Sequence, residues 1–252
     1  MPTFKITLAY DGTDFVGWQR QASGASIQGL LEDALRGLDG RSVAAVGAGR
    51  TDAGVHALGQ VASFSLERQT DASTVVRALN ARLPPEVRVL SAAEMPHDFH
   101  ARFDTRSKTY HYRIWNGDVV SPFEQRYVWH VPGALDVDAM RDAARRIEGA
   151  HDFAAFQAAG SDASTTERHV LASAIERSGS LLTYRIAGDG FLRHMVRAIA
   201  GSLVEVGRGR HPSSWIDEVI ASRDRATAGR TAPAHGLFLM SIEYKRSLAD
   251  EA

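Results

Sequence analysis

A decapeptide at residues 47–56, Gly-Ala-Gly-Arg-Thr-Asp-Ala-Gly-Val-His, constrains the fold of this chain more than any other segment. An apolar run precedes it at residues 43–46, and an alternating run follows at residues 60–66. The pattern predicts a tight loop between two strands, because its three glycines let the backbone turn sharply and let other groups approach closely. Asp52 lies near the centre of this loop, and Arg50 gives its charge a local partner. A carboxylate held on a rigid sheet in this way is a candidate nucleophile or general base.

Two common functions of glycine-rich loops are excluded here. A phosphate-binding P-loop ends in Gly-Lys-Ser/Thr, and no Gly-Lys pair occurs in the chain. A dinucleotide-binding fingerprint needs a glycine where Asp52 stands and a helix after the loop, whereas an alternating run follows here. The loop alone is compatible with two interpretations, a catalytic carboxylate or a tight turn with a solvated aspartate.

The composition limits the classes of protein to which the chain can belong. With 252 residues, 44% of them hydrophobic, it can bury a substantial core in one or two domains. It has no cysteine, which excludes disulfides and thiolate metal sites and favours a reducing, cytoplasmic location. No apolar run of about 18 residues could span a membrane, and no N-terminal stretch resembles a signal peptide. The net charge of −1 is unlike that of small basic nucleic-acid binders, although arginine, which suits phosphate contacts, dominates the basic residues.

Hydrophobic periodicity predicts two α/β halves, at residues 1–105 and 106–246, followed by a loose tail at residues 247–252. Strands and helices interspersed with hairpins favour an α+β fold, in which an antiparallel-rich sheet is backed by helices. Besides the strands that flank the loop, the first half is expected to contain strands at 3–10 and 87–92, a helix at 27–38 capped by Ser26, and a helix at 73–83 ended by Pro84.

The second half follows the same mixture of elements. Its last predicted helix would place Arg193 and Arg197, four residues apart, on one face. The predicted elements are strands at 109–114 and 237–244, a hairpin from 175 to 186 with its turn at 178–180, and helices at 136–147 and 191–206.

Several blocks, in order along residues 3–244, resemble the signatures of the tRNA pseudouridine synthase A family. The loop block Gly49-Arg50-Thr51-Asp52-Ala53-Gly54-Val55-His56 resembles the catalytic loop of that family. The other matching blocks are residues 10–21, 26–29, 99–102, 108–112, 194–197, 201–203, 206–207 and 231–237. Blocks of this length in the same order make chance agreement a poor explanation.

The resemblance implies a particular fold and reaction. The fold would consist of two ferredoxin-like α/β halves joined in a continuous, mostly antiparallel sheet, with helices on one side and a central active-site cleft. The enzyme would convert uridine to pseudouridine at positions 38, 39 and/or 40, in the anticodon stem-loop of tRNA, with no cofactor and no metal. The family acts as a homodimer that binds tRNA across both subunits, and we expect the same of this chain.

The resemblance also assigns roles to individual residues. Asp52 would be the catalytic nucleophile, Tyr110 would stack on the base and remove the C5 proton, and Arg197 would pair with Asp52. Leu237 would pack near the uracil, and Arg50 would contact RNA or order the loop. Each has an ordinary structural alternative, such as a strand tyrosine, a solvated helix arginine or a core leucine. Independently of the resemblance, the arginines expected to bind phosphates are Arg20, Arg102, Arg208 and Arg210, with Arg193 and Arg230 as further candidates.

Two further features bear on the function. Gln157 stands where many relatives have an arginine expected to contact RNA. His97 and His100 are spaced like a metal pair, but no metal is expected because cysteines and a Glu-x-x-His signature are absent. The alternative function is a non-catalytic RNA-binding module on a ferredoxin-like sheet. The chain has no aromatic RNP1 pattern, and the combination of Asp52 with the tyrosine and arginine above favours the enzyme.

Overall fold

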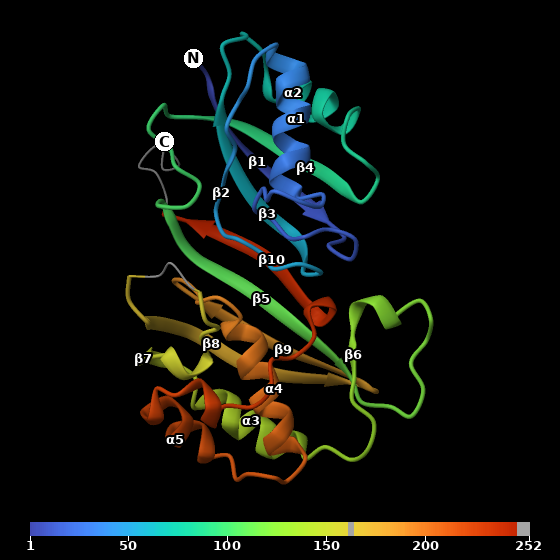
Figure 1. The fold of residues 1–252 in the computed structure, drawn as a ribbon, viewed down its shortest axis with the longest axis vertical. Helices are drawn as coiled ribbons and strands as arrows, with labels where there is room; N and C mark the ends of the chain where they lie inside the picture. The colour runs from blue at the N-terminus through green and yellow to red at the C-terminus, as the bar shows by residue number, and fades with distance from the viewer. Residues whose placement is uncertain (161–163, 246–252) are drawn as a thin grey trace. The chain divides into compact units, whose positions relative to one another are not determined.

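The computed structural model describes residues 1–160 and 164–245, so the predicted tail at 247–252 lies outside the described residues. The chain forms two compact units (Figure 1). Unit 1 contains Met1–Arg106 together with the chain from Leu239, and unit 2 contains Ser107–Phe238. The predicted boundary at 105 lies close to the end of the first segment. The final strand, however, belongs mostly to unit 1, whereas the sequence placed it in the C-terminal half.

Unit 1 is built around antiparallel strands. Alternation of apolar residues makes β1 (Thr3–Tyr10) a strand whose Phe4, Ile6 and Leu8 are fully buried. Its neighbours are β3 (His56–Ser65) on one side and β4 (Val87–Met95) on the other, both antiparallel to it. The order in this unit is β4-β1-β3-β10, where β10 is Leu237–Tyr244 and the short β2 (Val46–Gly47) pairs with β3.

Two amphipathic helices complete unit 1. Helix α1 (Ile27–Asp39) begins at Ser26, whose side chain accepts a hydrogen bond from the Gly29 amide, as predicted for an N-cap. It ends at Gly40, which adopts the left-handed conformation that favours glycine. Helix α2 (Ala72–Asn80) contacts both α1 and β4, so its buried Val75 and Leu79 join the core of this unit.

Unit 2 repeats the mixture of strands and helices. Strand β5 (Thr105–Trp115) pairs antiparallel with β9 (Leu181–Gly188), and β9 pairs with β8 (Glu167–Ser178) in the predicted hairpin. The ladder continues antiparallel to β7 (Gly149–Asp152), whereas β6 (Trp129–His130) pairs in parallel with β5. The helices are α3 (Val137–Arg145), α4 (Met195–Gly207) and α5 (Trp215–Ser222), of which α3 packs on α4 and β8.

The structure corrects the predicted start of the last long helix. Residues 191–194 are not helical, because His194 has a positive φ of 62° and α4 begins at Met195. Arg193 therefore does not share a helix face with Arg197. Its guanidinium donates instead to the carbonyls of Ala159 and Gly160. Helix α5 and the short strands β6 and β7 were not predicted.

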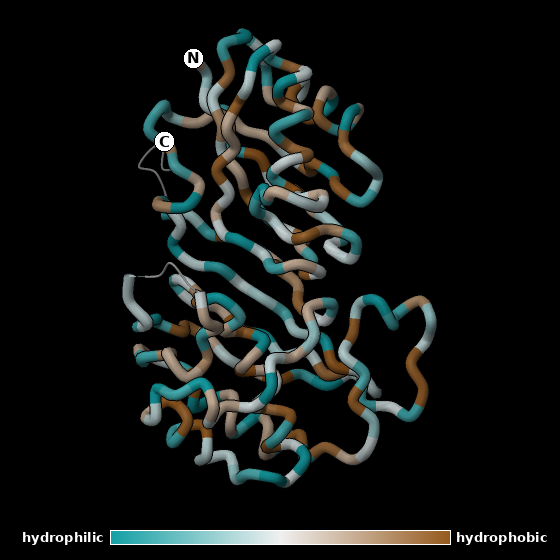
Figure 2. Tube along the Cα trace, viewed as in Figure 1, coloured by the Kyte–Doolittle hydropathy of each residue, from teal (hydrophilic) through white to brown (hydrophobic). Residues whose placement is uncertain are grey.

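The predicted α+β class is confirmed, with mostly antiparallel strands and helices in both units. Figure 2 shows hydrophobic and hydrophilic segments interspersed along the chain in each unit, which is the pattern of amphipathic elements around a core. Among residues 1–160 and 164–245, no helix has the length and apolarity needed to cross a membrane.

Candidate active site

The loop that carries Asp52 lies in unit 1, between β2 and β3. It is shorter than predicted, because β3 already begins at His56. A turn closes the loop, since the Val55 amide donates to the Asp52 carbonyl at 3.1 Å and Gly54 has a φ of 76°. The Asp52 side chain is partly exposed and Arg50 is exposed. The loop thus presents a carboxylate at a fixed turn, on a unit whose strands are antiparallel.

The loop is held by the segment that follows β1. The Trp18 amide donates to the Thr51 carbonyl at 3.0 Å, and the Gly54 amide donates to the Phe15 carbonyl at 3.3 Å. A Cβ on Gly17 would lie 2.5 Å from the Thr51 oxygen, so only glycine permits this approach. The first matching block of the sequence and the catalytic-loop block therefore form one structure.

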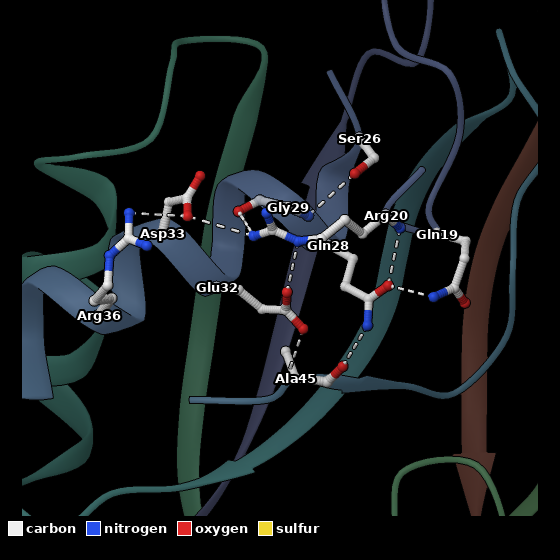
Figure 3. A network of polar contacts seen from close by, with 9 residues as sticks. All are labelled: Gln19, Arg20, Ser26, Gln28, Gly29, Glu32, Asp33, Arg36 and Ala45. Carbon is white, nitrogen blue, oxygen red and sulfur yellow. Dashed lines mark hydrogen bonds and ion pairs between the residues drawn. The ribbon is translucent and has the colours of Figure 1, made fainter. Parts of the chain in front are cut away.

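Trp18 connects this structure to helix α1. Its ring is buried against Gly47, where a Cβ would overlap the indole. Its carbonyl accepts a hydrogen bond from the Gln28 amide at 2.9 Å. Figure 3 shows the Gln28 side chain accepting from Gln19 and from the Arg20 amide while donating to the Ala45 carbonyl. The segment beneath the loop is consequently fixed at both its backbone and its side chains.

A cluster of buried polar side chains also supports the loop. The Tyr10 hydroxyl lies 2.8 Å from the Thr51 hydroxyl, and the Gln60 amide nitrogen donates to the Gly49 carbonyl at 2.9 Å. Burial raises the pKa of Tyr10 to about 12, against the hydrogen bonds from Thr51 and Gln60 that lower it. The sequence analysis did not identify this cluster. Its only signal was polar residues placed within strongly apolar strands.

His56 anchors the far end of the loop. Its Nδ1 lies 3.0 Å from the Gly12 amide nitrogen and 3.1 Å from a carboxylate oxygen of Asp11. The same oxygen of Asp11 accepts from the Thr13 amide and hydroxyl. Because the His56 ring is almost completely buried, these contacts fix where β3 begins.

Arg20 is engaged within the protein. Its guanidinium lies 2.9 Å from Glu32 and 3.4 Å from Asp33, and it donates a further hydrogen bond to the Gly29 carbonyl (Figure 3). Burial tends to lower the pKa of Arg20, but its bonds to the two carboxylates outweigh this and raise it. A phosphate would have to compete with both carboxylates. Arg102, in contrast, is exposed, and its guanidinium lies 5.9 Å from the centre of the Phe103 ring.

Tyr110 lies in unit 2, in the middle of β5. It pairs across the sheet with Ile186, and its ring packs edge-on against Phe191 with centroids 5.2 Å apart. The side chain is 6% exposed. The strand pairing fixes the backbone at Tyr110, and the edge-on contact with Phe191 orients its ring.

Arg197 is hydrogen-bonded to the segment that precedes β10, residues 228–236, which is called the strap below. Its Nε donates to the Ala232 carbonyl at 2.8 Å, while the Ala232 amide donates to the Arg197 carbonyl at 3.1 Å. Gly201 lies one turn further along α4, where a Cβ would overlap the Arg230 carbonyl oxygen. The Ser202 hydroxyl accepts from the Gly229 amide at 2.9 Å. The blocks 201–203 and 231–237 thus orient Arg197.

The polar groups around Arg197 are buried, as for Tyr112, or half-buried, as for His235. Tyr112 donates to the Pro233 carbonyl at 2.8 Å, and burial raises its pKa, although the charges of Arg197 and Arg230 oppose the rise. Burial lowers the pKa of His235, and the charge of Arg197 adds to this effect. Leu237 follows directly and is 6% exposed.

Arg208 and Arg210 share one acidic partner. Glu205 lies 3.5 Å from the Arg208 guanidinium and 2.5 Å from that of Arg210. The carboxylate offsets part of their positive charge. Any phosphate bound by these arginines would therefore approach a group of three side chains, Arg208, Arg210 and Glu205, with a net charge of about +1.

The predicted site residues therefore fall into two sets. Unit 1 carries Arg20, Arg50, Asp52 and Arg102, and unit 2 carries Tyr110, Arg197, Arg208, Arg210 and Leu237. Their roles stay predictions from the resemblance. In the part of the chain that the structure describes, no group of three or more His, Asp or Glu side chains is arranged to hold a metal ion.

Comparison with known proteins gives a consistent result. A family model described as tRNA pseudouridine synthase matches residues 6–104 and 143–245. The tRNA pseudouridine synthase A of Myxococcus xanthus is 48% identical over 246 residues, which cover 97% of this chain and 93% of that protein. Proteins of the same name from Solibacter usitatus and Moorella thermoacetica are 47% and 46% identical, each over 97% of this chain and 100% of the relative.

Proposed function

The chain belongs to the tRNA pseudouridine synthase family, and we propose that it converts uridine to pseudouridine at positions 38, 39 and/or 40 in the anticodon stem-loop of tRNA. It is an RNA pseudouridine synthase, an isomerase that acts on uridine in tRNA. The observation that carries the finer proposal is the clamped loop around Asp52. A backbone fixed on three sides holds one partly exposed carboxylate, which is the pre-organisation that catalysis requires.

The chemistry conserves atoms and electrons. The bond from ribose C1′ to uracil N1 breaks, the base turns, and C1′ bonds to C5, while the proton on C5 leaves and N1 gains one. In the proposed mechanism, the Asp52 carboxylate is the nucleophile. Tyr110 stacks on the base, and its hydroxyl takes the C5 proton, a general-base role for which a positioned side chain contributes about 10²–10⁴-fold. Arg197 is the basic partner of Asp52.

The proposed substrate must be brought to these residues. A uridine paired in a stem becomes reachable only when it flips out, at a cost of a few kcal/mol. Leu237 would pack near the flipped uracil, and Arg50 would contact the RNA. Phosphate contacts would offset the cost of flipping, and the arginines proposed for them are Arg20, Arg102, Arg208 and Arg210. The exposed Arg102 is the best placed of these, since Arg20 already binds two carboxylates. We further propose a cytoplasmic homodimer that binds tRNA across both subunits.

The test replaces Asp52 with Asn, which removes the charge and keeps the size. We expect Asp52→Asn to fold and to bind tRNA but to lose at least about 10³-fold in isomerisation rate, because the reaction loses its nucleophile. The measurement is the rate at which pseudouridine forms at each position of tRNA taken from a strain in which the gene for this protein is deleted. The tRNA is treated with either the wild-type protein or Asp52→Asn. Activity within tenfold of wild type would remove Asp52 from the mechanism. A wild-type protein that binds tRNA and leaves its uridines unchanged would support the non-catalytic RNA-binding alternative.

A further inference from the structure

The buried polar side chains of Tyr10, Thr51 and Gln60 form a hydrogen-bond network that supports the Asp52 loop. Gln60 donates from its amide nitrogen to the Gly49 carbonyl at 2.9 Å and to the Tyr10 hydroxyl at 3.3 Å. Tyr10 can then direct its own proton to the Thr51 hydroxyl at 2.8 Å. The side-chain oxygen of Gln60, Oε1, accepts a hydrogen bond from the Val61 backbone amide at 3.1 Å. Each side-chain amide and hydroxyl of the two strand residues has a partner.

These residues sit where apolar side chains would pack more simply. Gln60 is 0% exposed, Tyr10 is 5% exposed and Thr51 is 7% exposed. A buried polar group is costly unless it is bonded, so polar residues here need a function that an apolar core would not provide. A fully bonded network gives one unique geometry rather than extra stability. The geometry fixed in this case is that of the loop.

The network holds the chain immediately before Asp52. Thr51 is tied twice, through its hydroxyl to Tyr10 and through its carbonyl to the Trp18 amide at 3.0 Å. Gly49 is tied by Gln60 from the neighbouring strand. On the other side, the Asp52 carbonyl is held by the Val55 amide. Release of the Thr51 hydroxyl would let the peptide that carries Asp52 rotate about its remaining backbone contacts.

We propose that Tyr10 and Gln60 are positioning residues for the isomerisation, acting through Thr51 and Gly49 to fix the direction of the Asp52 carboxylate. This inference rests on the proposed function of Asp52. Neither residue touches the substrate in this account. Their removal affects the chemical step and leaves tRNA binding intact, because displacement of a reacting group by about 1 Å can cost on the order of 10²-fold in rate.

The experiment compares variants that remove one hydroxyl each. Tyr10→Phe and Thr51→Val are both expected to lower the single-turnover rate on tRNA, at saturating enzyme, by about 10- to 100-fold. The Kd for tRNA should change by less than about twofold, since no RNA contact is removed. Thr51→Ser, which keeps the hydroxyl, should retain most of the rate. The double variant Tyr10→Phe/Thr51→Val should be no slower than Tyr10→Phe alone, because the bond lost in Thr51→Val is already lost in Tyr10→Phe.

Unit 2 offers a matched control. The Tyr184 hydroxyl lies 3.0 Å from the Ser173 hydroxyl, both side chains are buried, and neither is assigned to the site. Tyr184→Phe should lower stability about as much as Tyr10→Phe and leave the single-turnover rate unchanged. If Tyr10→Phe is no slower than Tyr184→Phe at equal folded fraction, the positioning role is wrong.

Asp52→Asn, assayed in parallel, separates the two hypotheses. An inactive Asp52→Asn beside a fully active Tyr10→Phe overturns only the positioning role. An active Asp52→Asn overturns the proposed function as well. An inactive Asp52→Asn, slow Tyr10→Phe and Thr51→Val, and an active Thr51→Ser support both.

Discussion

The Asp52 loop in unit 1 and the Arg197 helix in unit 2 solve the same problem by different means. Both hold in place the backbone that carries one charged side chain, and both place glycine where two backbone segments meet. The loop has few backbone partners of its own, so buried side chains from distant strands supply the missing bonds. The helix already satisfies most of its own backbone, so a few bonds to one neighbouring segment, from Arg197 to Ala232 and from Gly229 to Ser202, hold it in place. A loop site therefore depends on hydroxyls and amides, whereas a helix site depends on small residues and backbone contact.

After the loss of Asp52 itself, the largest effect should come from the anchored guanidinium of Arg197 in unit 2. We expect Arg197→Ala to lower the isomerisation rate by about 10²–10³-fold, as loss of one pre-organised donor does elsewhere. Arg197→Lys should restore little of it. A lysine keeps the charge but has no Nε–H in the position that donates to the Ala232 carbonyl. Single-turnover rates on tRNA measure this.

A neighbouring arginine supplies the control for that experiment. Arg225 also bonds this strap, donating to Thr231 and Ala228, and is not assigned to the site. Arg225→Lys should be nearly as active as wild type. An Arg197→Lys variant with wild-type activity would show that charge alone suffices and that the strap is unnecessary.

The second effect concerns the close approach at Gly201. Gly201→Ala should destabilise unit 2 by about 1–3 kcal/mol, because its Cβ would overlap the Arg230 carbonyl oxygen, which belongs to backbone and moves little. Gly207→Ala, at the end of the same helix, would meet the flexible side chain of Met140. Alanine is the better helix former, but the buried Met140 must shift, so this variant should cost less stability than Gly201→Ala. Hydrogen exchange of the α4 amides in urea distinguishes them, and equal protection in both variants would contradict the backbone clamp.

The sequence predicted most helices and strands, but not the hydrogen bonds between distant segments that hold the site residues in place. The strand Leu237–Tyr244 has the predicted bounds, and the Ser26 cap is confirmed. Both could be predicted because each depends on a local sequence pattern. The predicted start of α4 at residue 191 was wrong. Phe191 and Leu192 fit a helical period, and no sequence pattern reveals the positive φ of His194, which ends that period. The short α5 follows Ser214 and has Asp217 and Glu218 in its first turn, a helix-start signal that the sequence prediction overlooked.

The candidate site shows the same division. The signature blocks located Asp52, Tyr110 and Arg197 by resemblance. The hydrogen bonds that hold the loop join residues 41 and 50 positions apart, as in Tyr10 with Thr51 and with Gln60. Such pairs follow from strand order and register, which hydrophobic periodicity does not determine.

A third, smaller effect should distinguish the units on acidification. Burial lowers the pKa of His111 and of His235 in unit 2, so the folded state prefers their neutral forms. Their contribution to stability is complete above the ordinary value of about 6.5 and is lost as the pH falls below it. In unit 1, the Asp71 cap of α2 has its pKa lowered by bonds from Ser73 and Thr74. Its contribution is lost only as the pH falls below about 3.9.

Protection factors from hydrogen exchange at two pH values test this difference. Between about pH 7 and pH 5, amides of β5 around His111 should lose protection, while amides of α2 should keep theirs. His235→Gln retains a side-chain donor for the Val128 backbone and should reduce the loss near residue 235. Equal losses in both regions would mean that the two histidines do not govern the acid response.

The smallest effect concerns the arginines that share Glu205, and it tests whether unit 2 holds RNA by charge in addition to orienting Arg197. If Arg210 contacts a phosphate, Arg210→Ala should weaken tRNA binding about threefold near physiological salt and reduce the slope of log K against log salt by just under one. Glu205→Gln should do the opposite, because it releases both Arg208 and Arg210 from a carboxylate that now competes with phosphate. The measurement is tRNA binding from low to high salt. The slope of log K against log salt should be shallower than wild type for Arg210→Ala and steeper than wild type for Glu205→Gln. Slopes that stay parallel to wild type would place the phosphate contacts elsewhere, with the exposed Arg102 of unit 1 as the next position to replace.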